Sequence, residues 1–85
     1  MKYKIVAVRD NAIGTFAQPW FVPSIGAAVR AFGDEVKREG SNGQSNPLNM
    51  HPNDFDLYDL GVYDDDGVFE THIPNKIASG VDYKG

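Results

Sequence analysis

The chain has 85 residues, enough for one domain and no more, because compact domains rarely fall below about 50 residues. Apolar residues make up 41% and charged residues 24%, a globular composition that excludes a disordered chain. The absence of cysteine excludes disulfide scaffolds, cysteine-based zinc sites and thiol nucleophiles, and no apolar run has the length of a membrane helix.

The net charge of −4 is distributed unevenly along the chain. Residues 1–38 carry six basic and three acidic side chains, a net charge of +3. Residues 39–85 carry two basic and nine acidic side chains, a net charge of −7. This asymmetry indicates one surface that attracts anions and another that repels them.

The first two predicted elements are strands. Residues 2–10 are rich in β-branched side chains and apolar on both faces, which favours a central strand. Asn11 and Gly14 are typical of the tight turn that follows. Residues 15–22 predict a second, poorer strand, because Pro19 cannot donate a hydrogen bond to a sheet. We therefore expect an edge strand or a partly paired one.

The helix is the clearest element. Pro23 ends the extended stretch, Ser24 is a good N-cap, and Gly40 ends the helix. Its apolar residues follow a period of 3.6 and form one stripe: Ile25, Ala28, Val29, Phe32 and Val36. This stripe predicts a helix that packs on an apolar sheet face. Gly26 and Gly33 lower its helix propensity and indicate a close approach to the sheet or to a partner.

The second half predicts a loop and a hairpin. Residues 39–50 are polar and rich in Gly, Ser and Asn, which predicts a flexible loop. Residues 55–63 and 68–73 predict two strands joined by an acidic turn in which Gly67 takes a positive φ. Pro74 is expected to end the last strand, so residues 74–85 are expected to form a C-terminal tail.

The expected fold is α+β, in the order strand, strand, helix, strand, strand. One mostly antiparallel sheet carries one helix packed on one face, within a single domain at residues 1–73. The candidates for the covered sheet face are Ile5, Phe16, Leu57, Leu60 and Val68. The opposite face is then exposed and carries aromatic residues.

The sequence holds no motif for catalysis or metal binding. With Gly67 at the sixth position of a calcium loop, the first and twelfth positions fall on Val62 and Ile73, so that template fails. His51 and His72 are the only histidines and lack the spacing of a zinc site. Phosphate-binding glycine loops and serine nucleophile elbows are absent as well. We therefore expect neither an enzyme nor a cofactor.

Nucleic-acid binding is a stronger hypothesis. Proteins that bind single strands combine exposed aromatic rings with a basic track for phosphates. The candidate binding residues are Lys2, Lys4, Arg9, Trp20, Phe21 and Arg30, with Tyr3 and Phe16 beside them. Two alternatives stay open, because these rings can equally form the core of a small domain or contact a protein partner. The acidic second half argues against strong phosphate binding.

The chain also resembles a known family. Its strand ending in Asp10 is followed by the pair Pro19-Trp20 and then by a helix carrying Ala28, Arg30 and Phe32. A third motif follows before an acidic turn and comprises Pro52, Asp54, Phe55, Leu57, Tyr58, Leu60 and Gly61. This succession resembles the small nonstructural protein of gokushovirus-type microviruses, which are bacteriophages with single-stranded DNA genomes. The resemblance covers roughly residues 1–70.

The resemblance implies a phage accessory protein made in the infected cell, with a role in single-stranded DNA replication or packaging. The expected partners are single-stranded DNA and a phage or host protein of replication or assembly. The alternative is a protein-interaction module without DNA binding, such as a host-directed inhibitor. A homodimer is expected because so small a domain buries little surface alone. The expected location is the host cytoplasm, with no membrane contact.

Overall fold

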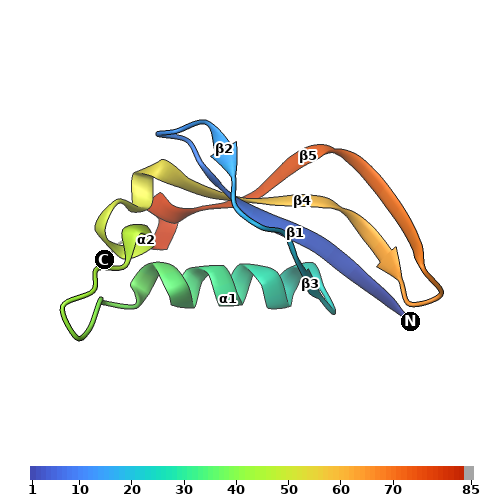
Figure 1. The fold of residues 1–85 in the computed structure, drawn as a ribbon, viewed down its shortest axis with the longest axis horizontal. Helices are drawn as coiled ribbons and strands as arrows, with labels where there is room; N and C mark the ends of the chain where they lie inside the picture. Colours follow the sequence, from blue (N-terminus) through green and yellow to red (C-terminus); the bar gives the residue numbers. More distant parts are fainter. Residues whose placement is uncertain (84–85) are drawn as a thin grey trace.

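The computed structural model describes residues 1–83 and has an α+β fold, as predicted (Figure 1). Helix α1 lies along one face of a five-stranded sheet in which every pairing is antiparallel. The strands are β1 (Lys2–Asp10), β2 (Thr15–Phe16), β3 (Trp20–Val22), β4 (Phe55–Asp64) and β5 (Val68–Ser79). The helices are α1 (Ile25–Lys37) and α2 (Pro47–Met50), with short 3₁₀ turns η1 (Pro52–Asp54) and η2 (Gly80–Tyr83).

Strand β1 is central, as its two apolar faces predict. It pairs with β4 over its whole length, and β2 and β3 pair with its other edge. The predicted second strand is thus divided into two short ones, separated by residues 17–19. Pro19 lies in this gap, where its missing amide proton costs no sheet hydrogen bond. The expectation of a partly paired strand is confirmed.

Helix α1 begins where predicted. The side-chain oxygen of Ser24 accepts a 3.2 Å hydrogen bond from the backbone N–H of Ala27 and so caps the helix. The helix ends at Lys37, ahead of Gly40, with Arg38 as its C-cap. Gly33 does mark a close approach, but its neighbour is the ring of Tyr83 in η2 rather than the sheet.

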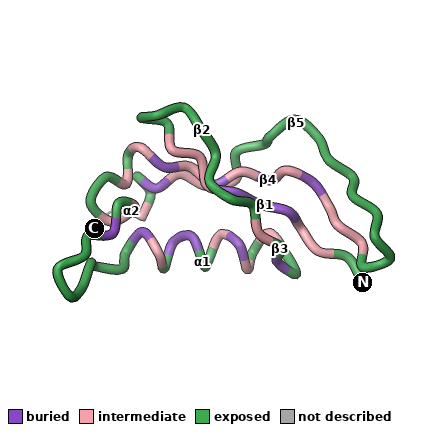
Figure 2. Tube along the Cα trace, in the orientation of Figure 1, coloured by how far each residue is buried: buried purple, intermediate pink, exposed green. Residues whose placement is uncertain are grey.

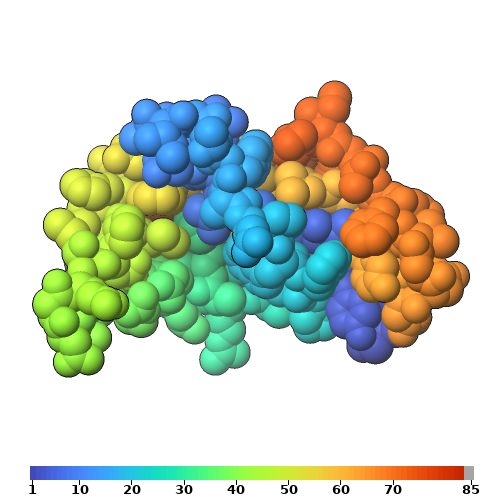
Figure 3. Space-filling view, viewed as in Figure 1, coloured from blue at the N-terminus to red at the C-terminus, as the bar shows by residue number. Residues whose placement is uncertain are grey.

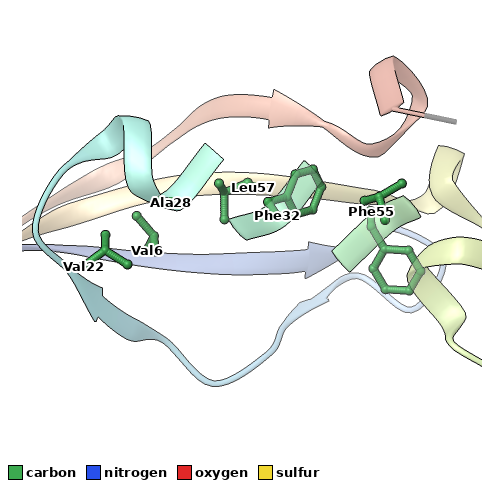
Figure 4. Packing of buried hydrophobic residues seen from close by; sticks show 7 residues of the cluster. Val6, Val22, Ala28, Phe32, Phe55 and Leu57 are labelled. Carbon is green, nitrogen blue, oxygen red and sulfur yellow. The ribbon is translucent and has the colours of Figure 1, made fainter. Parts of the chain in front are cut away.

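The core lies between α1 and the sheet, and the side chains of the two layers point toward each other in Figure 4. Its buried members are Val6, Val22, Ala28, Phe32, Val36, Phe55 and Leu57. Of the sheet residues predicted to face the helix, Leu57 alone belongs to this cluster. Ile5 and Phe16 lie on the opposite face, and Val68 is exposed, so these three predictions are wrong.

The error has a simple physical cause. Successive side chains of a strand point to opposite faces, so one set in β1 must face α1 and the other must face away. Val6 and Val8 pack with the helix, which sends Tyr3, Ile5 and Ala7 to the other side. Both sets are apolar, and the sequence pattern of β1 therefore does not distinguish them.

The expected C-terminal tail is also wrong for residues 74–83. Strand β5 continues through Pro74 to Ser79, and η2 follows with Gly80 buried. Pro74 fits because residues 72–74 have no partner in β4; the register passes from the Gly61–Thr71 pair to the Asp59–Asn75 pair. A proline at such an irregularity removes no ladder hydrogen bond. Residues 84–85 of the expected tail lie outside the described residues.

The polar loop predicted at residues 39–50 ends earlier than expected. Helix α2 occupies its last four residues, and Asn46 just before it is buried, with 4% of its surface exposed. The Asn46 side-chain amide donates 2.8 Å hydrogen bonds to the carbonyl oxygens of Glu35 and Arg38. Its side-chain oxygen accepts from the backbone N–H of Leu48. Asn46 therefore joins α2 to the C-terminal end of α1.

We expect Asn46→Ala to lower the free energy of unfolding by about 2 kcal/mol, because it removes a buried side chain that bonds the carbonyl oxygens of Glu35 and Arg38 and caps α2. Urea denaturation followed by circular dichroism measures this loss. Ser45→Ala, at an exposed neighbouring position, serves as the control and should change stability little. An unchanged midpoint for Asn46→Ala would contradict the assigned role.

The molecule is elongated, with principal extents of 42 × 24 × 21 Å. The hairpin of β4 and β5 extends beyond the N-terminal end of α1, and the chain N-terminus lies beside its turn (Figure 1). Figure 2 shows that most of β5 is exposed, whereas β4 alternates between buried and half-buried residues. No helix within residues 1–83 is long and apolar enough to cross a membrane.

Candidate functional site

The sheet face opposite α1 carries six aromatic side chains. We call this surface the aromatic face, and its members are Tyr3, Phe16, Phe21, Tyr58, Tyr63 and Phe69. They come from all five strands, so the sheet itself holds them in place. No helix among the described residues covers this face, because α1 lies on the other one.

Strand alternation and register bring these rings together. Tyr3 lies opposite Tyr63 in the β1–β4 pairing, and Tyr63 lies opposite Phe69 in the β4–β5 pairing. Phe21 lies opposite Ile5, which is two residues beyond Tyr3 in β1 and therefore on the same face. Side chains of directly opposed residues project from the same face and touch. The register therefore produces a continuous cluster of rings across four strands.

Four rings form this cluster near the hairpin end of the sheet. The Tyr63 ring is its centre: its centroid lies 4.7 Å from that of Phe69, 5.3 Å from that of Phe21 and 6.3 Å from that of Tyr3. The Phe21 and Phe69 centroids are 6.2 Å apart. The planes of Tyr3 and Tyr63 are inclined by only 27°. These contacts restrict the rings and preorganise the surface.

A second, smaller group lies further along the same face. Phe16 and Tyr58 meet edge to face with centroids 5.2 Å apart, and the Arg9 guanidinium lies 5.4 Å from the Phe16 ring centroid. Ile5 and Ala7 are buried between the two groups, although no helix covers them. Their burial follows from the register, because Phe21 lies beside Ile5 and Tyr58 beside Ala7.

The rings are nevertheless accessible from solvent. Phe69 exposes 58% of its surface and Phe21 exposes 49%. Large apolar side chains that are exposed singly are ordinary, whereas a contiguous group of them marks an interaction site. The rings of the aromatic face contact one another rather than lying scattered, which makes this face the candidate interaction surface.

The charged side chains of the aromatic face are few. Arg9 lies opposite Phe16, and Lys76 lies opposite Tyr58, so two cations flank the smaller group. Asp56 lies opposite Arg9, and its carboxylate accepts a 2.8 Å hydrogen bond from the side-chain amide of Asn11. Asn11 in turn accepts a 3.0 Å hydrogen bond from the Arg9 side chain. Arg9 is thus held in position with its charge still exposed to a ligand.

The structure separates the six residues predicted from sequence. Phe21 and Arg9 lie on the aromatic face, at different ends of it. Trp20, the neighbour of Phe21 in β3, points to the other face and packs half-buried against the core. The strand geometry therefore does not support base stacking by Trp20 on the same surface as Phe21.

The remaining three cations lie elsewhere. The Lys4 ammonium lies 3.3 Å from a carboxylate oxygen of Asp59, so an acidic neighbour already neutralises its charge. Lys2 alternates with Tyr3 and so projects from the α1 side of the sheet, while Arg30 is exposed on the outer side of α1. These residues do not form one basic track with the aromatic rings.

Asp59 is the one buried carboxylate in the part of the chain described here. One of its oxygens accepts a 3.1 Å hydrogen bond from the Gly61 backbone N–H and lies 3.6 Å from the His72 ring nitrogen. Residues 1–83 contain no group of three or more His, Asp or Glu side chains that could hold a metal ion. Asp59 therefore links β4 to β1 through its ion pair with Lys4, and its carboxylate lies beside the His72 ring of β5.

Tyr58, Tyr63, Phe69 and Lys76 were missed as site residues. A signal for two of them exists in the sequence. Counting outward from the acidic turn places Tyr63 opposite Phe69 if Asp64 pairs with Val68, as it does. Tyr58 and Lys76 carry no such signal, because irregularities in the β4–β5 register shift their pairing.

These features define a class of protein: a small sheet-and-helix domain that presents an ordered aromatic surface on the sheet face opposite its helix. The model of the phage ORF5 protein family matches residues 3–83, and the chain belongs to that family. It is accordingly a bacteriophage protein, which confirms the coarser part of the resemblance seen in the sequence. No curated protein and no solved structure matches it.

Proposed function

We propose that the chain is a non-enzymatic phage accessory protein that binds single-stranded DNA on the aromatic face. The observation that carries this proposal is the contiguous group of half-exposed rings on a sheet face left open by the helix. Every base has a flat π surface, so exposed rings bind unpaired bases with little sequence preference. Sheets that stack bases on surface aromatic residues are a recurrent way of holding single strands.

The charges on this face support a modest electrostatic contribution. Arg9 and Lys76 are the cations placed to meet phosphates beside the stacked bases. Two phosphate contacts correspond to a slope of log K against log salt of about −1.4 for a single strand. The protein's net charge of −4 also keeps the electrostatic contribution small, because it limits nonspecific attraction to DNA.

The biological setting follows the resemblance found in the sequence. We propose a nonstructural protein of a microvirus of the gokushovirus type, acting in single-stranded genome replication or packaging in the host cytoplasm. We further propose a homodimer, which the long exposed edge of β5 supports. A protein-interaction module without DNA binding, such as a host-directed inhibitor, is the alternative; the acidic net charge favours it.

The test is fluorescence anisotropy with a labelled oligothymidylate of about 16 nucleotides, titrated at several salt concentrations. We expect saturable binding, and Phe69→Ala should weaken it about tenfold because a stacked base loses its ring. Arg9→Gln should reduce the salt slope by about 0.7. Trp20 emission should stay unchanged, since Trp20 faces away from the bound strand.

Two controls make this experiment decisive. Phe69→Trp keeps a ring at the same position and should retain binding, whereas Ile73→Ala removes exposed apolar surface from β5 without removing a ring. Sedimentation in the same buffer gives the mass of the complex. Absence of an anisotropy change at low salt, or equal loss in Phe69→Ala and Ile73→Ala, would refute DNA binding by the aromatic face.

A further inference from the structure

A cavity of about 350 Å³ lies on the α1 side of the sheet, away from the aromatic face. Its lining residues are Val8, Asp10, Ala17, Trp20, Ala31, Phe32, Glu35, Leu48 and Phe55. They come from β1, the β2–β3 segment, α1, α2 and β4. Figure 3 shows the side of the molecule on which the light-blue β2–β3 segment and the green α1 adjoin. The volume lies within the range of about 300–1,000 Å³ that is typical of ligand sites.

The walls of this cavity are apolar and partly rigid. Phe32 and Phe55 are buried core residues, and Trp20 and Leu48 pack half-buried against that core. The four side chains are therefore held by the packing that stabilises the fold. Water in such a space finds few hydrogen-bond partners, so an apolar group that replaces it is favoured.

Two residues with small side chains lie at the rim of the cavity. Ala17 follows β2 and Ala31 lies on α1, and both are exposed. A polypeptide can pass over two methyl groups without a clash while one of its side chains enters the space between them. A deep closed cavity would instead suit only a free small molecule.

The polar groups at this cavity are acidic. Asp10 ends β1, and Glu35 projects from α1 on another side of the space, while no Lys or Arg among residues 1–83 lines it. Glu35 is bonded to Arg38 at 2.6 Å, and this hydrogen bond holds the pKa of its carboxyl below the usual value. Asp10 forms no salt bridge within residues 1–83; its side chain accepts a 3.0 Å hydrogen bond from the backbone N–H of Ala12.

We propose that this cavity binds a basic peptide segment of a partner protein, which inserts one large apolar side chain against Trp20 and places a Lys or Arg beside Asp10. Charge complementarity with Asp10 selects this occupant, because Glu35 is already paired with Arg38 whereas the Asp10 carboxylate attracts a cation and repels phosphates and acidic peptides. At small protein interfaces, a buried apolar side chain usually supplies most of the binding energy, and a flanking charge adds specificity. The site is separate from the aromatic face and does not depend on DNA binding there.

The probe for this proposal is the peptide acetyl-Gly-Lys-Phe-Arg-Gly-amide, titrated into the intact protein. Trp20, the only tryptophan of the chain, reports occupancy through its emission, and amide NMR shifts of Ala31 and Leu48 locate the peptide. We expect saturable changes in both. A peptide with Gln in place of Lys and Arg should bind several-fold more weakly.

Three variants separate the contributions. Ala31→Phe fills the cavity from its rim and should weaken peptide binding at least about tenfold. Ser41→Phe adds similar bulk at an exposed loop position outside the cavity and should leave binding unchanged. Asp10→Asn keeps the acceptor for Ala12 and should reduce affinity for the basic peptide to that of the Gln peptide.

Other results would overturn the proposal. Equal binding of a peptide with Glu in place of Lys and Arg would show an apolar site without charge selection. Dimerisation that Ala31→Phe abolishes would assign the cavity to a second copy of the chain. No shift at millimolar peptide would remove the site altogether. The oligothymidylate titration of Ala31→Phe, expected to match the unmodified protein, distinguishes each failure from failure of DNA binding.

Discussion

Replacing Phe32 by Ala is expected to lower the free energy of unfolding by about 3–5 kcal/mol. The Phe32 side chain is 2% exposed and lies in the centre of the core between α1 and the sheet. Its ring also meets Tyr83 edge to face, with centroids 6.0 Å apart. The substitution therefore leaves a cavity bounded by α1, β4 and η2, and these elements cannot collapse into it together.

This loss is large compared with the total stability of so small a domain. At about 0.05–0.15 kcal/mol per residue, 85 residues give about 4–13 kcal/mol in all. Urea denaturation followed by Trp20 fluorescence measures the change, with Phe69→Ala as a matched control. Phe69 has the same side chain on the exposed aromatic face, and its loss should cost about 1 kcal/mol or less. Similar losses for both variants would contradict the assigned core.

Replacing Gly61 by Ala is expected to cost about 3 kcal/mol. Gly61 has a φ of +146°, a backbone conformation that only glycine adopts readily. A methyl group there would also lie against the carbonyl oxygen of Glu70 and the Cα atom of Thr71 in β5. Strand β5 would have to move away from β4, which opens the hairpin that carries Tyr63 and Phe69.

Gly67→Ala is the matched control for this prediction. Gly67 also has a positive φ, +98°, but a methyl group there would meet no atom within 4 Å. Its cost should therefore be conformational strain alone, about 1 kcal/mol. Thermal unfolding gives the two values, and hydrogen exchange of the β5 amides shows whether the hairpin opens. Equal effects would mean that the contact with Glu70 has no energetic importance.

The two proposed sites would lie on opposite sides of one sheet. The β3 strand contributes to both, because Phe21 projects into the aromatic face and its neighbour Trp20 into the cavity. One face has exposed rings with two cations beside them, and the other has an apolar recess with carboxylates. The two proposals together would allow the protein to hold a nucleic acid and a basic protein segment at the same time.

Local signals in the sequence predicted most elements correctly. The Ser24 cap and the apolar stripe through Phe32 located α1, because a helix depends on contacts between residues a few positions apart. Gly67 likewise located the hairpin turn, where it takes a positive φ as expected. Residues 74–83 were predicted wrongly, since the place of Pro74 depends on an irregular register between two strands.

The candidate site was predicted only in part, for a related reason. Phe21 and Arg9 were expected at a binding surface and do lie on the aromatic face, whereas Trp20 lies on the other side. Neighbouring residues in a regularly paired strand project to opposite faces, and β3 pairs regularly with β1, so Trp20 and Phe21 do not share one surface. The sequence pattern shows that the two differ but not which of them faces the helix.

The amino-acid sequence by itself determined the α+β class, the position of the helix and the aromatic character of the strands. Only the tertiary structure decided which side of β1 the helix covers, and therefore which rings remain exposed. The physical reason is that β1 is apolar on both faces, so packing against either face buries a similar apolar surface. The choice rests on long-range contacts with β4 and α1, which lie far from β1 in the chain.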